Sequence, residues 1–140
     1  MAEGALDRFV AAQDGIYAEA LGELCRGRKT GHWMWFVFPQ IAGLGYSATA
    51  RFYAIGDIGE ARAYLAHPLL GPRLVECVDA LLSHRGQTAG AILGPVDAMK
   101  LRSSMTLFVA AAADPAPFVA VLDAFFAGAR DPATLERLGG

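Results

Sequence analysis

The sequence predicts an all-α or nearly all-α fold, a compact bundle of about seven to nine short helices. Nearly every apolar repeat in the chain has the three- to four-residue spacing of a helix face. The run Trp33–Phe38 is the segment that best fits a strand, and a lone strand has no partner to pair with. The length of 140 residues and the hydrophobic content of 54% suit one globular domain over residues 1–140 and exclude intrinsic disorder.

In the first half of the chain, apolar residues at helical spacing surround Gly15 and predict two short helices or one bent helix. Ser47 is the expected N-cap of the next helix, because its hydroxyl can accept a backbone N–H of the first turn. Asp57 and Glu60, three residues apart, form a capping box for a helix that reaches Ala66. This half is therefore predicted to consist of short helices joined by turns.

In the second half, the most regular pattern is an apolar stripe that follows Pro68, a residue suited to a first helical turn. The stripe consists of Leu70, Leu74, Cys77, Val78 and Leu81. A helix beginning at Pro95 places its apolar residues on one face, so Arg102 and Thr106 must lie on another. A further helix is expected to end at Gly128, and Asp131 starts a last short helix.

The charge balance limits the classes of partner. With 12 basic and 14 acidic residues, the net charge of −2 supplies no general field for phosphate backbones, so sequence-independent nucleic-acid binding is not expected. The longest apolar stretches fall far short of the ~20 residues needed to cross a membrane. Glu3 and Asp7 stand where a secretory signal needs positive charge, and the two cysteines are expected to be reduced thiols. We therefore expect a cytoplasmic protein.

Familiar catalytic and metal-binding signatures do not occur in the sequence. The three histidines have no His or Cys neighbour at zinc-ligand spacing, so no metal site is expected. Neither cysteine has a CxxC partner, and no nucleophile elbow or P-loop is present. No cofactor is therefore expected.

The densest unusual segment is residues 28–40, which contains both tryptophans. A buried aromatic plug and a ligand-facing surface are both open interpretations for three of its rings, those of Trp35, Phe36 and Phe38. Trp33 and His32 lie next to Arg28 and Lys29 and precede a glycine-rich turn. This arrangement predicts a pocket that combines ring surface with positive charge and suits a nucleobase or a sugar phosphate.

Two further segments indicate an anion. Residues Gly43–Ser47 can present free backbone N–H groups at a helix start, and an ordinary turn with an N-cap serine explains them as well. Lys100 and Arg102 lie beside serines that also suit close helix packing, and a guanidinium binds phosphate or carboxylate through paired donors. The residues expected to converge in one pocket are His32, Trp33, Gln40, Lys100 and Arg102.

Several of these segments together resemble a known family, the bacterial domain of unknown function 1810, sometimes mislabelled calpastatin. The resemblance extends from Leu6 to Leu138 and implies a compact, mostly helical domain with no established activity. The segments that carry it are His32–Gln40, Gly43–Gly45, the pattern from Glu60 to Gly71, and Lys100–Phe108.

The C-terminal part of the chain shows a second, more distant similarity. Residues 100–108, Phe118 to Leu122, Gly128 and Asp131 are similar to the C-terminal half of the NADAR superfamily, whose helical domains process ADP-ribose-type N-glycosides. By position, Glu60 is the nearest candidate for the acidic catalytic residue of that superfamily, and its capping box explains Glu60 equally well.

Two functions from different classes remain open. The first is an N-glycoside hydrolase acting on a nucleotide or an ADP-ribose derivative, in which Arg28, Lys29 and Arg102 would anchor phosphate. Trp33 would stack on a ring, and a carboxylate, with Glu60 as the candidate, would stabilise the oxocarbenium-like centre or activate water. The second is a non-catalytic module that binds the same phosphorylated small molecule. A carboxylate within hydrogen-bonding reach of the pocket would distinguish them; the sequence indicates no oligomeric state.

Overall fold

The computed structural model describes the backbone of residues 2–139 and the side chains of residues 5–139. Within these residues there are ten α-helices and no β-strand, so the expected all-α fold is confirmed, with slightly more helices than the sequence predicts. The helices are α1 (Ala2–Gln13), α2 (Tyr17–Arg26), α3 (Met34–Val37), α4 (Ala48–Phe52), α5 (Ile58–Ala66), α6 (Leu70–Leu82), α7 (Ala89–Leu93), α8 (Pro95–Ala111), α9 (Ala116–Phe126) and α10 (Pro132–Arg137).

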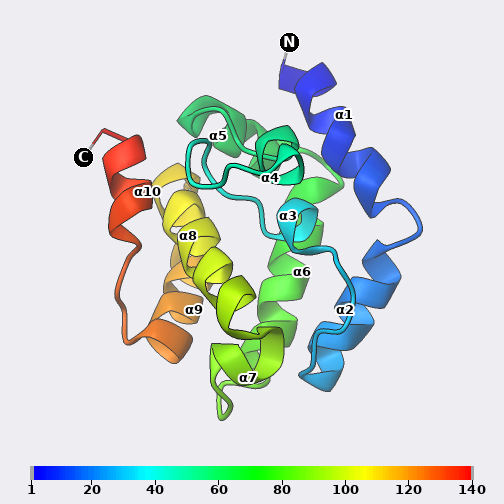
Figure 1. The fold of residues 1–140 in the computed structure, drawn as a ribbon, viewed down its shortest axis with the longest axis vertical. Coiled ribbons are helices and arrows are strands. Elements are labelled where there is room, and N and C mark those ends of the chain that lie inside the picture. Colours follow the sequence, from blue (N-terminus) through cyan, green and yellow to red (C-terminus); the bar gives the residue numbers. More distant parts are fainter. Residues whose placement is uncertain (1, 140) are drawn as a thin grey trace.

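Helix α8 lies at the centre of the bundle (Figure 1) and carries both core and polar residues. Helices α5, α7, α9 and α10 pack against it, and α6 packs on α2, α5 and α9. Pro95 occupies the first turn of α8, where its missing N–H costs no hydrogen bond. One face of α8, with Leu101, Met105 and Phe108, is buried in the core. Arg102 and Thr106 of the same helix hydrogen-bond the segment between α9 and α10.

The apolar stripe of α6 is buried as the sequence predicts. Leu74 and Leu81 are 1% and 0% exposed, and Cys77 between them is fully buried. Burial raises the pKa of the Cys77 thiol to about 12, which keeps this side chain protonated and inert. Cys77 is therefore a core residue, whereas Cys25 of α2 is exposed, and both are free thiols.

The predicted helix ends are confirmed by their hydrogen bonds. The side chains of Ser47, Asp57 and Asp131 each accept the backbone N–H three residues further on, at 2.8–3.1 Å. Gly128 follows α9 with a φ of +79° and donates its N–H to the carbonyl of Leu122 at 2.9 Å. Local sequence signals therefore determine where these helices begin and end.

Two short helices were not predicted. Residues Met34–Val37 form a single helical turn, in which Val37 and Phe38 donate to the carbonyls of Trp33 and Met34 at 3.2 and 3.0 Å. The strand considered for this run is wrong, because no second strand lies beside it to accept its hydrogen bonds within residues 2–139. Helix α7 has only five residues, too few to show a helical period in the sequence.

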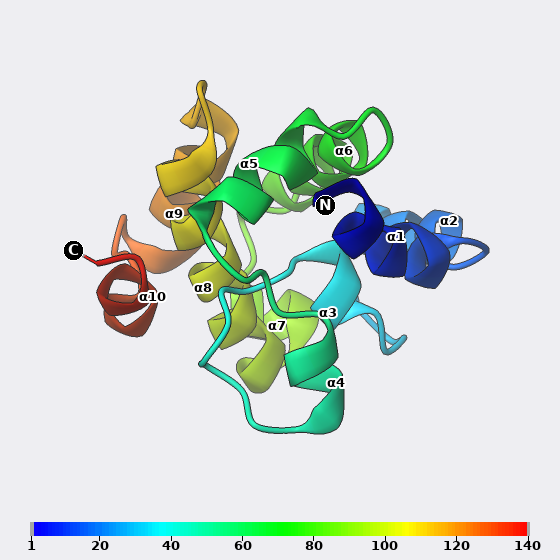
Figure 2. The same ribbon diagram turned by 90° about the horizontal axis from the view of Figure 1, so that it is seen from above.

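The segment between α3 and α4 decides where the candidate site lies. Two backbone hydrogen bonds of 2.8 Å join Gln40–Ala42 to Ile55 and form an isolated bridge. Further on, Arg137 of α10 donates to the carbonyl of Gly43 at 3.2 Å, and the φ of +98° at Gly43 favours glycine. Figure 2 shows this segment swinging outward from α3 and returning to α4. The loop Gly43–Ser47 is thereby held at the surface, close to α10.

Two classes of feature are not found in the described part of the chain. No helix there is long and apolar enough to cross a membrane. No group of three or more His, Cys, Asp or Glu residues there has the arrangement needed to hold a metal ion.

Candidate functional site

A hollow of about 500 Å³ opens between the Gly43–Ser47 loop, α4, α8 and the start of α10. We call it the cleft. Its volume falls within the ~300–1,000 Å³ typical of small-molecule pockets. The residues that line it are Trp35, Gln40, Leu44, Gly45, Tyr46, Ser47, Ala50, Val96, Met99, Lys100, Arg102, Ser103, Asp131 and Ala133.

Exposed apolar side chains gather at the cleft. Tyr46, Val96 and Met99 are 77%, 66% and 73% exposed, and all three line it. They make up half of the large hydrophobic residues that are exposed among residues 5–139. Apolar surface concentrated around a hollow marks a binding site, whereas scattered apolar residues need no explanation.

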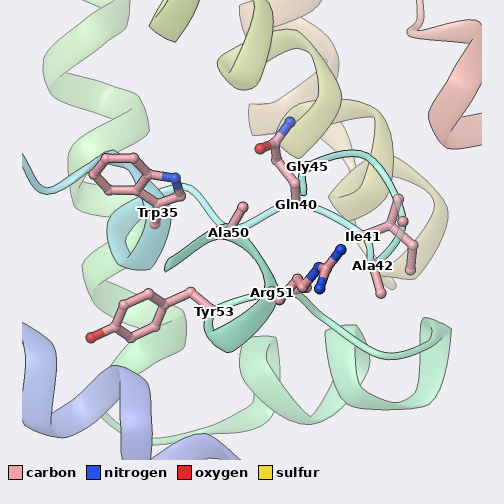
Figure 3. Close-up of a pocket in the computed structure, with 10 residues that line it drawn as sticks. Trp35, Gln40, Ile41, Ala42, Gly45, Ala50, Arg51 and Tyr53 are labelled. Carbon is pink, nitrogen blue, oxygen red and sulfur yellow. The ribbon is translucent and has the colours of Figure 1, made fainter. Parts of the chain in front are cut away.

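A second, smaller hollow of about 160 Å³ adjoins the cleft. It shares Trp35, Gln40, Gly45 and Ala50 with the cleft. Figure 3 shows the rings of Trp35 and Tyr53 on one side of this hollow and Gln40 and Ile41 on the other, with Arg51 of α4 between them. Trp35 and Gln40 therefore stand where the two hollows meet.

The indole of Trp35 is covered by a cation. The Nζ of Lys100 lies 4.3 Å from the centre of a Trp35 ring and 3.5 Å from Oδ1 of Asp97. Oδ2 of the same carboxylate lies 2.8 Å from Nζ of Lys29. One carboxylate thus faces two ammonium groups, which leaves an excess positive charge at this wall of the cleft.

Arg102 lines the cleft, but its guanidinium is already bound to the backbone. Its Nε donates to the carbonyl of Ala129 at 3.0 Å, and its Nη2 donates to the carbonyl of Arg130 at 2.7 Å. Two of the five N–H donors of Arg102 thus hold the segment between α9 and α10, and the predicted anion contact of Arg102 stays a prediction for its remaining donors. Thr106, one turn away, accepts the N–H of Asp131 at 2.9 Å and secures the same segment.

Asp131 brings a carboxylate into the cleft wall, which sequence reasoning missed. Its Oδ2 accepts the hydroxyls of Ser103 and Thr134 at 3.0 and 2.6 Å and also caps α10. None of the other side chains of residues 5–139 donates to its Oδ1. The N-cap signal at Asp131 was visible in the sequence, but its position beside Ser103 of α8 was not.

Trp33 lies in the core and not in the cleft. It is 1% exposed, and its indole N–H donates to Oε1 of Glu23 at 3.0 Å. The predicted stacking of a ligand on Trp33 is therefore wrong, because other side chains already cover both the ring and its N–H. Of the two tryptophans, the half-buried Trp35 is the one that lines both hollows, although the sequence analysis considered it for the core plug.

Glu23 of α2 is a buried carboxylate that no sequence motif indicated. It is 1% exposed, and its Oε1 accepts the backbone N–H groups of Thr30 and Gly31 at 2.6 and 2.8 Å, besides the Trp33 indole. Burial acts to raise the pKa of Glu23, but these donors outweigh it and lower the pKa below its ordinary value. All three donors come from residues 30–33, so Glu23 organises this loop rather than a reaction.

The other predicted cations and His32 lie away from the cleft. Arg28 and His32 are exposed and line neither hollow. Lys29 forms an ion pair with Asp97, and its side chain is 8% exposed. Of the predicted binding residues, the cleft contains Gln40, Ser47, Lys100 and Arg102.

Glu60 is also placed outside both hollows. It pairs with Arg8 at 3.2 Å, and its Oε1 accepts the N–H of Gly56 at 2.8 Å. Both contacts join α1 to the start of α5. The carboxylate of Glu60 therefore has structural partners and lines neither hollow, so the structure does not bring it to the other predicted site residues.

The fold and the cleft define an all-α protein in which the central helix forms one wall of a pocket of small-molecule size. The chain belongs to the family of proteins of unknown function DUF1810, which it matches over residues 3–138. It is similar to the conserved hypothetical protein Rv1873 from Mycobacterium tuberculosis, with 48% sequence identity, a TM-score of 0.94 and 96% of each chain covered. No curated protein matches the chain. The similarity to the NADAR superfamily stays a prediction.

Proposed function

We propose that this protein binds a small phosphorylated heterocyclic molecule, of the nucleotide or ADP-ribose type, in the cleft. The observation that carries the proposal is the pairing of Trp35 with Lys100 at the junction of the two hollows. An indole offers a stacking surface for a base, and an ammonium beside it offers a charge for phosphate. The exposed rim of Tyr46, Val96 and Met99 supplies further apolar contact for a ring.

The two tryptophans allow a direct test. Trp33 is buried and Trp35 lies at the cleft, so a stacking ligand quenches the fluorescence of Trp35 and leaves that of Trp33. We expect ADP-ribose or one of the common nucleoside monophosphates to quench the wild-type protein. Because a ligand that binds only the native state stabilises it, the same compound raises the melting temperature.

Matched variants give this experiment its control. Trp35→Phe removes the quenching signal while the emission of Trp33 remains. Arg28→Ala removes an exposed cation that lines neither hollow, so it leaves both quenching and stabilisation unchanged. If no compound in the panel quenches or stabilises the wild-type protein, the polar groups of the cleft are structural and the proposal fails.

A second candidate function, hydrolysis of an N-glycosidic bond, is favoured by Asp131. A carboxylate in the wall of a nucleotide site can stabilise an oxocarbenium-like centre or activate water. Its contacts with Ser103 and Thr134 fix the orientation of the carboxyl group through Oδ2, and no described side chain donates to Oδ1.

Release of a free base from NAD, nucleotides or ADP-ribosylated compounds is the test of this second function. Asp131→Asn retains a good N-cap for α10 while it removes the charge, so we expect it to abolish release and preserve ligand binding. Binding without release across the panel would support the non-catalytic function. Release that persists in Asp131→Asn would exclude Asp131 as the acting carboxylate.

A further inference from the structure

The ring surface of the cleft is covered by a side chain of the protein itself. Nζ of Lys100 stands 4.3 Å from the centre of a Trp35 ring, within the distance of a cation–π contact. A planar ligand that stacks on this face of the indole must therefore move Lys100. Because cation–π contacts at partly exposed sites are weak, this displacement is a modest cost.

Of the two lysines that face Asp97, Lys100 is held less closely by the carboxylate. Its ion pair with Asp97 measures 3.5 Å, against 2.8 Å for Lys29, and its side chain is more exposed, at 21% against 8%. Asp97 is thus held mainly by Lys29, and one positive charge remains without full compensation. Arg102 is less able to respond, because its Nε and Nη2 bind backbone carbonyls.

We infer that Lys100 selects phosphorylated ligands over their unphosphorylated counterparts, by giving up the face of Trp35 to the ring of the ligand and binding its phosphate. This inference rests on the function proposed above. A nucleoside must displace the ammonium and has no phosphate to which the ammonium could bind. A nucleoside monophosphate displaces the same ammonium and gives it a charge-assisted contact. Lys100 thereby weakens binding of the nucleoside and strengthens binding of the monophosphate. The difference between the two affinities is the specificity of the cleft.

Calorimetric titration with the common ribonucleosides and their 5′-monophosphates tests the inference. The wild-type protein is expected to prefer the monophosphate of its base. Lys100→Ala removes both the charge and the cover over Trp35, so the affinity for the monophosphate falls about tenfold, because the lost charge-assisted contact outweighs the gain from the uncovered ring. The affinity for the nucleoside rises about two- to fivefold, the value of the lost cation–π contact.

Lys100→Met distinguishes the effect of the ammonium charge from the effect of covering the Trp35 ring. Methionine keeps an apolar stem of similar length over the indole, so this variant loses the preference for phosphate without any gain in affinity for the nucleoside. Arg28→Ala serves as the control for general electrostatics and retains the wild-type preference. Circular dichroism and melting temperature confirm that each variant is folded.

The outcomes are distinguishable. If the wild-type protein binds a monophosphate and Lys100→Ala retains the same preference, the inference is overturned while the proposed function stands. An equal loss of affinity for both ligands in Lys100→Ala also overturns it, because displacement predicts changes of opposite sign. If neither the wild-type protein nor Lys100→Ala binds any ligand of the panel, both the inference and the proposed function fail.

Discussion

Two tryptophans separated by one residue have opposite environments in this protein. Trp33 is 1% exposed, and its N–H is bound to a buried glutamate, Glu23. Trp35 is only partly buried, borders two hollows and carries the ammonium of Lys100 on its ring. The residue type and the local sequence are nearly the same, so the difference comes from the partners that α2 and α8 bring to each ring.

The two environments also differ in how completely their polar and charged groups are paired. Around Trp33, one carboxylate oxygen accepts three N–H donors, and the cluster is buried and complete. Around Trp35, Lys100 lies on the ring and shares Asp97 with Lys29, whose Nζ is 5.1 Å from the centre of the Trp33 ring, and apolar side chains of the cleft remain exposed to water. A completed polar cluster stabilises a fold, whereas an incomplete one beside a hollow has capacity for a ligand.

The largest expected difference between the two regions is in stability. Trp33→Ala should lower the free energy of unfolding by about 3–5 kcal/mol, because it opens a cavity in the core and leaves Glu23 without one donor. Trp35→Ala should cost about 1 kcal/mol, since its ring is partly in contact with water. Urea denaturation of the two variants measures both values. Equal losses would show that Trp35 is as much a core residue as Trp33.

The next effect concerns the charge of Glu23. Glu23→Gln should lower the free energy of unfolding by about 2 kcal/mol at neutral pH, because hydrogen bonds to a charged acceptor weaken when the charge is lost. The folded-state pKa of Glu23 lies below its unfolded value, so its contribution is complete above the unfolded value and disappears as the pH falls through the lowered pKa.

Denaturation as a function of pH checks this sign. The wild-type protein should lose more stability than Glu23→Gln as the pH falls below the ordinary range of a glutamate, and the two curves should approach each other in acid. Parallel curves across the whole range would mean that the donors do not lower the pKa of Glu23 in the folded protein.

A smaller difference in stability is expected between alanine variants of the two arginines that were predicted to bind phosphate. Arg102→Ala should lower the free energy of unfolding by about 1–2 kcal/mol, because the carbonyls of Ala129 and Arg130 lose their side-chain donors. Arg28→Ala should change stability by less than about 0.5 kcal/mol, as expected for an exposed surface residue. Thermal unfolding of both variants measures the difference. A neutral Arg102→Ala would restore Arg102 as a group free to bind an anion.

The smallest effect is spectroscopic and leaves the fold unchanged. Acrylamide should quench the wild-type fluorescence in part, through Trp35, and should quench Trp35→Phe far less, because Trp33 is buried. Stern–Volmer plots of the two proteins make the comparison. Equal quenching in both would contradict the assignment of Trp33 to the core.

Much of the fold was predictable because its signals are local. The caps at Ser47, Asp57 and Asp131 and the buried stripe through Leu74 and Leu81 depend on residues within a few positions of one another. The same holds in part for the candidate site. A glycine-rich loop at a helix start and a polar edge on α8 were both visible, and the cleft lies between them. The expectation of a single domain over residues 1–140 stays a prediction.

The sequence by itself therefore determined the helices, their ends and the core stripe of α6, since backbone hydrogen bonds and side-chain periodicity act over one or two turns. Only the tertiary structure decided which tryptophan is buried, which carboxylate faces the cleft and which cation is available there. Those outcomes depend on contacts between residues far apart in the chain, such as Arg102 with the carbonyls 27 and 28 residues away. A guanidinium or an indole has the same chemistry wherever it occurs, and its role is set by the partners that packing places beside it.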